Sequence, residues 1–135
     1  YDGSFVVVDL KSAQDTPGQI ETLVLNVASQ DSHAVMVMSQ IDPGSAGVAE
    51  ADNFVRMLSG YVVKVERMTA NKGARAKPVS AQAERGNIRV LRAPWNDAFF
   101  KELENFPEGA HDDIVDVLSG AFNELSGNQT TFDVL

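Results

Sequence analysis

The chain has 135 residues, 44% of them hydrophobic and 22% charged, which is ordinary for one compact globular domain. It has no cysteine, so disulfides and thiolate metal sites are excluded, and its net charge of −8 argues against generic nucleic-acid binding. Because the sequence has neither an apolar run long enough to cross a membrane nor a signal peptide, we expect an intracellular protein that is not secreted.

The first residues predict one arm of a hairpin. Residues 1–4 have the composition of a tight turn, and residues 5–10 are rich in valine, as in a strand. We therefore expect the strand before this turn, and with it the opening strands of the domain, to be missing. The strand at 5–10 is expected to run antiparallel to the rest of the sheet.

Helices and strands then alternate along the chain. Thr16, Pro17 and Gln19 predict the start of the first helix, with Thr16 as N-cap and Gln19 reaching back to it. Later elements follow from apolar periodicity and from the Gly and Pro residues that bound them. The expected elements are helix 16–29, strand 33–38, helix 45–58, strand 61–66, helix 78–84, strand 87–91, helix 95–106 and a last helix that starts near residue 111.

This order predicts an α/β fold, with a mixed sheet and helices on both of its faces. We expect a single domain over residues 1–125. Residues 126–135 are polar and are expected to form a loose tail.

The start of the last helix is the densest cluster of reactive side chains. His111, Asp112, Asp113 and Asp116 place an imidazole and three carboxylates within six residues. The apolar residues that follow predict a buried helix face centred near Ile114 and Leu125, which leaves Asp113 half-buried. Two interpretations stay open: acids in a first turn cap the helix, and clustered carboxylates bind a hard divalent cation.

Asp42 is a second candidate. It follows a buried strand and precedes a helix, and ligands in open α/β sheets collect outside the carboxyl ends of strands. The alternative is that Asp42 only caps the helix after it.

Basic residues gather in the middle of the chain. Nine of the eleven Lys and Arg residues lie between Arg56 and Arg92, where Glu66 and Glu84 are the only acids. This segment either contacts phosphates or forms ordinary solvated surface.

Four motifs follow one another along the chain. They are Ile41-Asp42-Pro43-Gly44-Ser45-Ala46-Gly47, the segment from Lys72 through Arg75 and Pro78 to Asn87, Pro94-Trp95-Asn96, and the segment from Phe106-Pro107 to Asp116. In this order they resemble the C-terminal nuclease domain of the large terminase subunits of tailed phages. Because four ordered motifs are far more specific than one, we give the resemblance most weight, and it reaches about Leu125.

The resemblance implies an RNase H-like fold and an endonuclease that cuts concatemeric viral DNA during genome packaging in the host-cell cytoplasm. It implies two divalent ions, Mg²⁺ or Mn²⁺, bound by Asp42, Asp113 and Asp116. His111 and Asp112 are expected to support these ligands. Lys72, Arg75 and Lys77 are expected to contact the backbone of double-stranded DNA.

The family's first-strand acid has no counterpart, since Asp9 lies on the strand that resembles the family's third. We therefore expect this chain alone to be weak or inactive. The resemblance also implies the ATPase domain, the small subunit and the portal as partners. The alternative is a non-catalytic module that docks on the packaging motor or binds DNA, in which the carboxylates only cap a helix.

Overall fold

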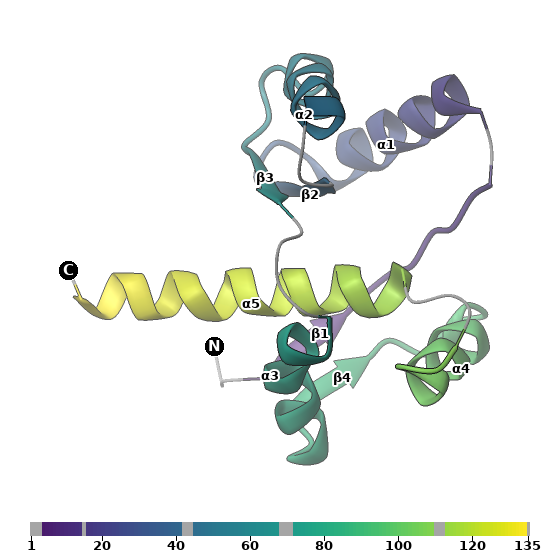
Figure 1. Cartoon of the computed structure of the whole chain (residues 1–135), viewed down its shortest axis with the longest axis vertical. Coiled ribbons are helices and arrows are strands. Elements are labelled where there is room, and N and C mark those ends of the chain that lie inside the picture. Colours follow the sequence, from purple (N-terminus) through teal and green to yellow (C-terminus); the bar gives the residue numbers. More distant parts are fainter. Residues whose placement is uncertain (1–3, 15, 42–44, 68–71, 110–112, 135) are drawn as a thin grey trace. The chain divides into compact units, whose positions relative to one another are not determined.

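The computed structural model describes residues 4–14, 16–41, 45–67, 72–109 and 113–134. The elements follow the predicted order (Figure 1). They are β1 (Phe5–Val7), α1 (Pro17–Asp31), β2 (Val37–Ile41), α2 (Ser45–Met57), β3 (Val63–Arg67), α3 (Lys72–Glu84), β4 (Ile88–Val90), α4 (Asn96–Asn105) and α5 (Asp113–Val134).

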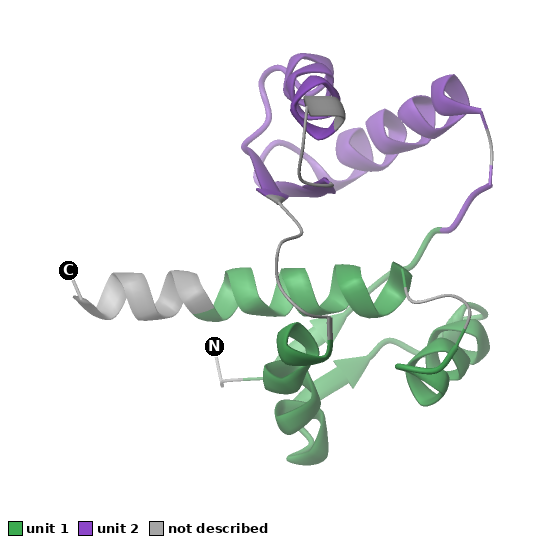
Figure 2. Cartoon of the chain, viewed as in Figure 1, with its two compact units in different colours: residues 1–11, 70–135 green, residues 12–69 purple. Residues whose placement is uncertain are grey.

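Two compact units make up the chain (Figure 2). One unit contains residues 1–11 and 70–135, and the other contains residues 12–69. We call them unit 1 and unit 2 and describe each by itself. The α/β class is confirmed, but the strand pairs of the described residues form two small sheets, one in each unit.

Unit 2 is built on the parallel pair of β2 and β3, with α2 packed against β2. The predicted start of α1 is confirmed: the Thr16 hydroxyl accepts a hydrogen bond from the Gln19 N–H, and the Gln19 side chain accepts one from the Thr16 N–H. Leu58, which is 1% exposed, and Ile41, which is 4% exposed, are among the most buried side chains of this unit.

Strand β2 begins four residues later than predicted, because the residues before it form a turn. Ser32 has a positive φ of 77°, and its carbonyl accepts a hydrogen bond from the Val35 N–H. The His33 ring stacks on Tyr61 with centroids 4.0 Å apart, and its Nδ1 lies 3.0 Å from the Gly60 carbonyl oxygen. These contacts hold the apolar residues near 33–36 outside the strand.

In unit 1, β1 pairs with β4 in parallel, so the antiparallel prediction is wrong. The Phe5 N–H donates to the Asn87 carbonyl at 2.8 Å, and the Leu91 N–H donates to the Val7 carbonyl at 2.9 Å. Both described strand pairs are parallel, whereas a mixed sheet was predicted. The hairpin prediction rested on residues 1–4, of which 1–3 lie outside the described residues.

Helix α3 begins at Lys72, whereas the sequence predicted a start at Pro78. Proline favours a first turn but is compatible with a helix interior when packing outweighs the lost hydrogen bond. Ala76 and Val79, 8% and 6% exposed, lie on one face of α3, which packs against α5. The Asn123 side chain also donates to the Arg75 carbonyl at 3.2 Å.

Helix α5 extends past Leu125 to Val134, so that the backbone of most of the expected tail is helical. In unit 1 it also contacts the short sheet, since the Phe5 and Phe122 rings meet edge to face with centroids 4.7 Å apart. Among the described helices, none combines the length and apolar character that crossing a membrane requires.

Candidate functional site

The two acids in the first turn of α5 differ in exposure. The side chains of Val115, Ser119 and Phe122 are 4%, 2% and 7% exposed and define the buried face. Each residue of an α-helix turns it by about 100°, so Asp113 lies almost opposite Val115 and Asp116 at the border of the buried face. Accordingly, Asp113 is exposed and Asp116 is half-buried.

The prediction that Asp113 is half-buried is therefore wrong. The sequence pattern centred the buried face on Ile114 and Leu125, about 100° away from its observed position, and Leu125 is 49% exposed. That pattern counted only apolar side chains. It therefore left out Ser119, which is 2% exposed and lies on the same face of α5 as Val115.

A carboxylate from another helix caps α5. Oε2 of Glu102, on α4, accepts hydrogen bonds from the N–H groups of Ile114 at 2.5 Å and Val115 at 3.3 Å. The first N–H groups of a helix have no partner within it, and a carboxylate there also offsets the positive end of the helix dipole. Glu102 thus performs the capping that was one of the two interpretations of the acidic cluster.

Sequence analysis did not single out Glu102. It lies 12 residues before Ile114, too far for a capping motif to reveal it. The available signal is its spacing: Glu102 follows the inward-facing Phe99 by three residues, which places both on the same side of α4. A half-buried acid at that position needs a hydrogen-bond donor, and the start of α5 provides two.

The end of α4 is held by a tight turn. The Asn105 carbonyl accepts hydrogen bonds from the N–H groups of Glu108 at 2.9 Å and Gly109 at 2.8 Å. A Cβ at Gly109 would lie 3.0 Å from the Asn105 Cβ, so that a side chain there would force a shift. The glycine of the Phe106–Gly109 motif is therefore required by the geometry of this turn.

Asp42, His111 and Asp112 lie outside the described residues. The strand β2 ends at Ile41, and at this end the Gln40 side chain donates to Glu66 Oε1 of β3 at 3.3 Å. The residues 37–41 and 113–134 belong to different units, so the convergence of Asp42 with Asp113 stays a prediction. Within the described part of the chain, no three Asp, Glu, His or Cys side chains lie close enough together to hold a metal ion.

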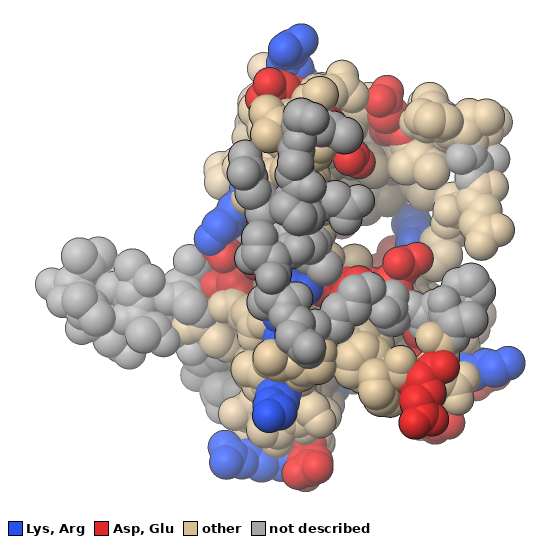
Figure 3. Space-filling model, in the orientation of Figure 1, with Lys and Arg blue, Asp and Glu red and all other residues tan. Residues whose placement is uncertain are grey.

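The basic candidates lie on α3. Lys77 is exposed and Arg75 is half-buried, while Lys72 is the first residue of the helix. Residues two apart on a helix do not face each other, so Arg75 and Lys77 point to different sides. Within unit 1, the view of Figure 3 shows basic side chains beside acidic ones.

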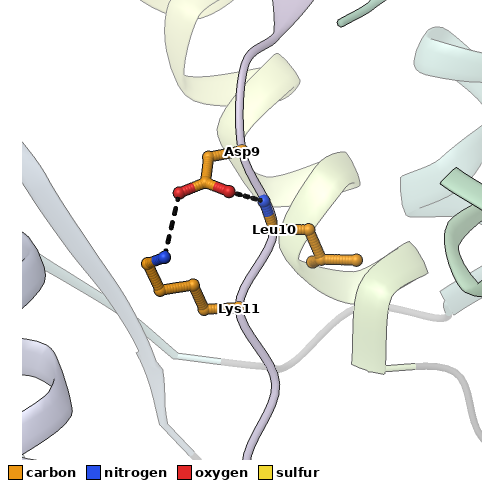
Figure 4. Close-up of polar contacts among 3 residues, drawn as sticks. All are labelled: Asp9, Leu10 and Lys11. Carbon is orange, nitrogen blue, oxygen red and sulfur yellow. Dashed lines mark hydrogen bonds and ion pairs between the residues drawn. The ribbon is translucent and has the colours of Figure 1, made fainter. Parts of the chain in front are cut away.

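Among the described residues, the partners of Asp9 are its neighbours in sequence (Figure 4). Its Oδ1 accepts a hydrogen bond from the Leu10 N–H at 2.8 Å, and its Oδ2 lies 3.4 Å from Lys11 Nζ. The ion pair is exposed, with 53% of the Asp9 side chain accessible, and contributes little to stability. Asp9 follows β1, and the expectation that it does not replace the first-strand acid stays a prediction.

Comparison with known protein families identifies the class. Residues 1–125 match the family described as the terminase RNaseH-like domain, which covers nearly the whole chain. The chain therefore belongs to this family, and the predicted resemblance and RNase H-like fold are confirmed. No curated protein and no solved structure matches the chain significantly.

Proposed function

We propose that this domain is a metal-dependent endonuclease that cuts concatemeric viral DNA during genome packaging. The observation that carries the proposal is the family match over residues 1–125, together with the exposed acidic first turn of α5. The proposed setting is the host-cell cytoplasm. The ATPase domain, small subunit and portal of the packaging motor are the proposed protein partners.

Two carboxylates of the described residues support the proposed divalent-cation site. Asp113 and Asp116 are three residues apart and therefore neighbours on the surface of α5. Because Glu102 satisfies the N–H groups of Ile114 and Val115, Asp113 is not needed to cap those groups and is available as a ligand. Carboxylate oxygens are the ligands that Mg²⁺ and Mn²⁺ prefer.

Each candidate residue has a proposed role. Asp42, Asp113 and Asp116 would hold two divalent ions, and His111 and Asp112 would orient these carboxylates. Such ions activate water and stabilise the charge that develops on a phosphodiester during hydrolysis. Lys72, Arg75 and Lys77 would bind DNA phosphates, which positions the backbone without reading its sequence.

The activity itself has a direct test. The full-length protein that carries this domain is expected to convert supercoiled plasmid to nicked and linear DNA with Mn²⁺. Excess EDTA is expected to abolish the conversion, because the carboxylates alone do not activate water. Cleavage that persists in EDTA, measured on agarose gels, would contradict the metal-dependent mechanism.

Lys77 tests the DNA contact. Lys77→Ala is expected to weaken binding to double-stranded DNA a few-fold, equally for unrelated sequences. It is expected to lower the slope of log affinity against log salt concentration by about 0.9, the value for one phosphate contact. Fluorescence anisotropy at several salt concentrations measures both quantities.

Lys101→Ala is the matched control, because Lys101 is also exposed on a helix of unit 1 but lies outside the basic segment. An unchanged slope for Lys77→Ala, or an equal loss for Lys101→Ala, would remove Lys77 from the proposed DNA contacts.

A further inference from the structure

Glu102 is an acidic side chain to which the proposed function gives no role. It is half-buried on α4, and the backbone groups that it binds are those of Ile114 and Val115, the two residues between Asp113 and Asp116. We propose that Glu102 is a positioning residue, which sets the place of the Asp113 and Asp116 carboxylates for a divalent cation. The inference rests on the proposed function and adds a residue to it.

The contact joins two helices. Most helix caps come from the residue directly before the helix and move with it. Here the cap comes from 12 residues upstream, so it ties the first turn of α5 to the body of α4. The bonds are charge-assisted, which makes them stronger than bonds between neutral groups.

Helix α4, which carries Glu102, is itself held by a buried aromatic side chain. Phe99 is 2% exposed and meets Trp95 and Phe100 edge to face, with ring centroids 5.7 and 5.4 Å apart. Glu102 lies three residues after Phe99, on the same side of the helix. The buried ring therefore fixes the backbone from which the Glu102 carboxylate reaches α5.

The Asp113 side chain depends on this backbone. It is exposed, and no hydrogen bond or ion pair joins it to another described residue. Within the described part of the chain, its carboxylate is therefore placed by the backbone of the first turn. Because Glu102 Oε2 accepts both N–H groups, Glu102 acts through the position of Asp113 and not as a ligand itself.

The test compares three variants of the full-length protein. Glu102→Ala removes the acceptor, Glu102→Gln keeps an acceptor oxygen without the charge, and Glu104→Ala is the control. Glu104 is an exposed acid on the same helix, two residues away. Three quantities are measured: amide hydrogen exchange at Ile114 and Val115 without metal, the Mn²⁺ concentration that gives half-maximal cleavage, and the cleavage rate at saturating Mn²⁺.

We expect Glu102→Ala to speed exchange at both amides and to raise the half-saturating Mn²⁺ concentration by about 10- to 100-fold, as loss of a supporting residue does at other metal sites. Glu102→Gln is expected to fall between Glu102→Ala and the parent. Glu104→Ala is expected to match the parent in all three measurements.

One result would overturn the inference: a Glu102→Ala protein with the parental half-saturating Mn²⁺ concentration. If that protein is also less stable than the parent, Glu102 is a structural cap only. These results are separable from failure of the proposed function: if Asp113→Asn keeps full cleavage, the nuclease assignment itself is wrong, whatever Glu102→Ala does.

Discussion

Asp113→Asn is expected to lower the DNA cleavage rate of the full-length protein at least about 100-fold, more than the usual effect of a residue that only supports a ligand. The reason is that asparagine keeps the size of the side chain but removes the charge that binds a divalent cation. Folding is expected to stay intact, because Asp113 is exposed and loss of one first-turn acid costs about 0.3–1 kcal/mol. Plasmid cleavage with Mn²⁺ and thermal unfolding measure the two effects.

Asp97→Asn is the matched control. Asp97 is also an exposed acid in the first turn of a helix of unit 1, α4, but it lies outside the proposed site. Its replacement is expected to leave cleavage unchanged. If Asp113→Asn still cuts at the parental rate, or if both variants lose activity equally, the acidic first turn of α5 is not a metal site.

Phe99→Ala is expected to have the largest effect on stability among single side-chain truncations in α4. Phe99 is 2% exposed and contacts the rings of Trp95 and Phe100. Truncation of a buried phenylalanine leaves a cavity and costs about 3–5 kcal/mol of unfolding free energy. Because α4 carries Glu102, we also expect faster amide exchange at the start of α5.

Phe100→Ala provides the comparison, since Phe100 is the same residue type one position along the helix and is 44% exposed. Its truncation is expected to cost about 1 kcal/mol. Urea denaturation followed by circular dichroism measures both variants. Equal losses would contradict the placement of Phe99 in the core and Phe100 at the surface.

The order of the nine described elements was predictable from sequence because each is marked by local chemistry. Thr16, Pro17 and Gln19 specify the start of α1 through contacts within four residues. Gly60, with a φ of 94°, lies in the turn between α2 and β3, where only glycine adopts that conformation easily.

The errors arose where distant contacts override local preference. Pro78 has the local signature of a helix start, yet packing of α3 against α5 extends the helix six residues before it. The direction of β1 depends on its pairing with β4, more than 80 residues away, which no local pattern encodes. The buried face of α5 includes Ser119, a small polar residue that carries no hydrophobic signal.

Part of the candidate site could likewise be predicted from sequence, and part could not. The acidic cluster at 111–116 and the family that it indicates could be recognised from residue order, and the family match confirms the resemblance. Glu102 could not be found in that way, because its role appears only when α4 and α5 are seen together. The roles of Asp42, Asp113 and Asp116 as ligands stay predictions.

Anomalous scattering from Mn²⁺-soaked crystals of the domain tests the central claim most directly. We predict a peak bound by the carboxylates of Asp42 and Asp113, with Asp116 close by. Two resolved carboxylates that lie far apart, with no peak at either, would contradict the metal site and favour a module that docks on the packaging motor or binds DNA without cutting it.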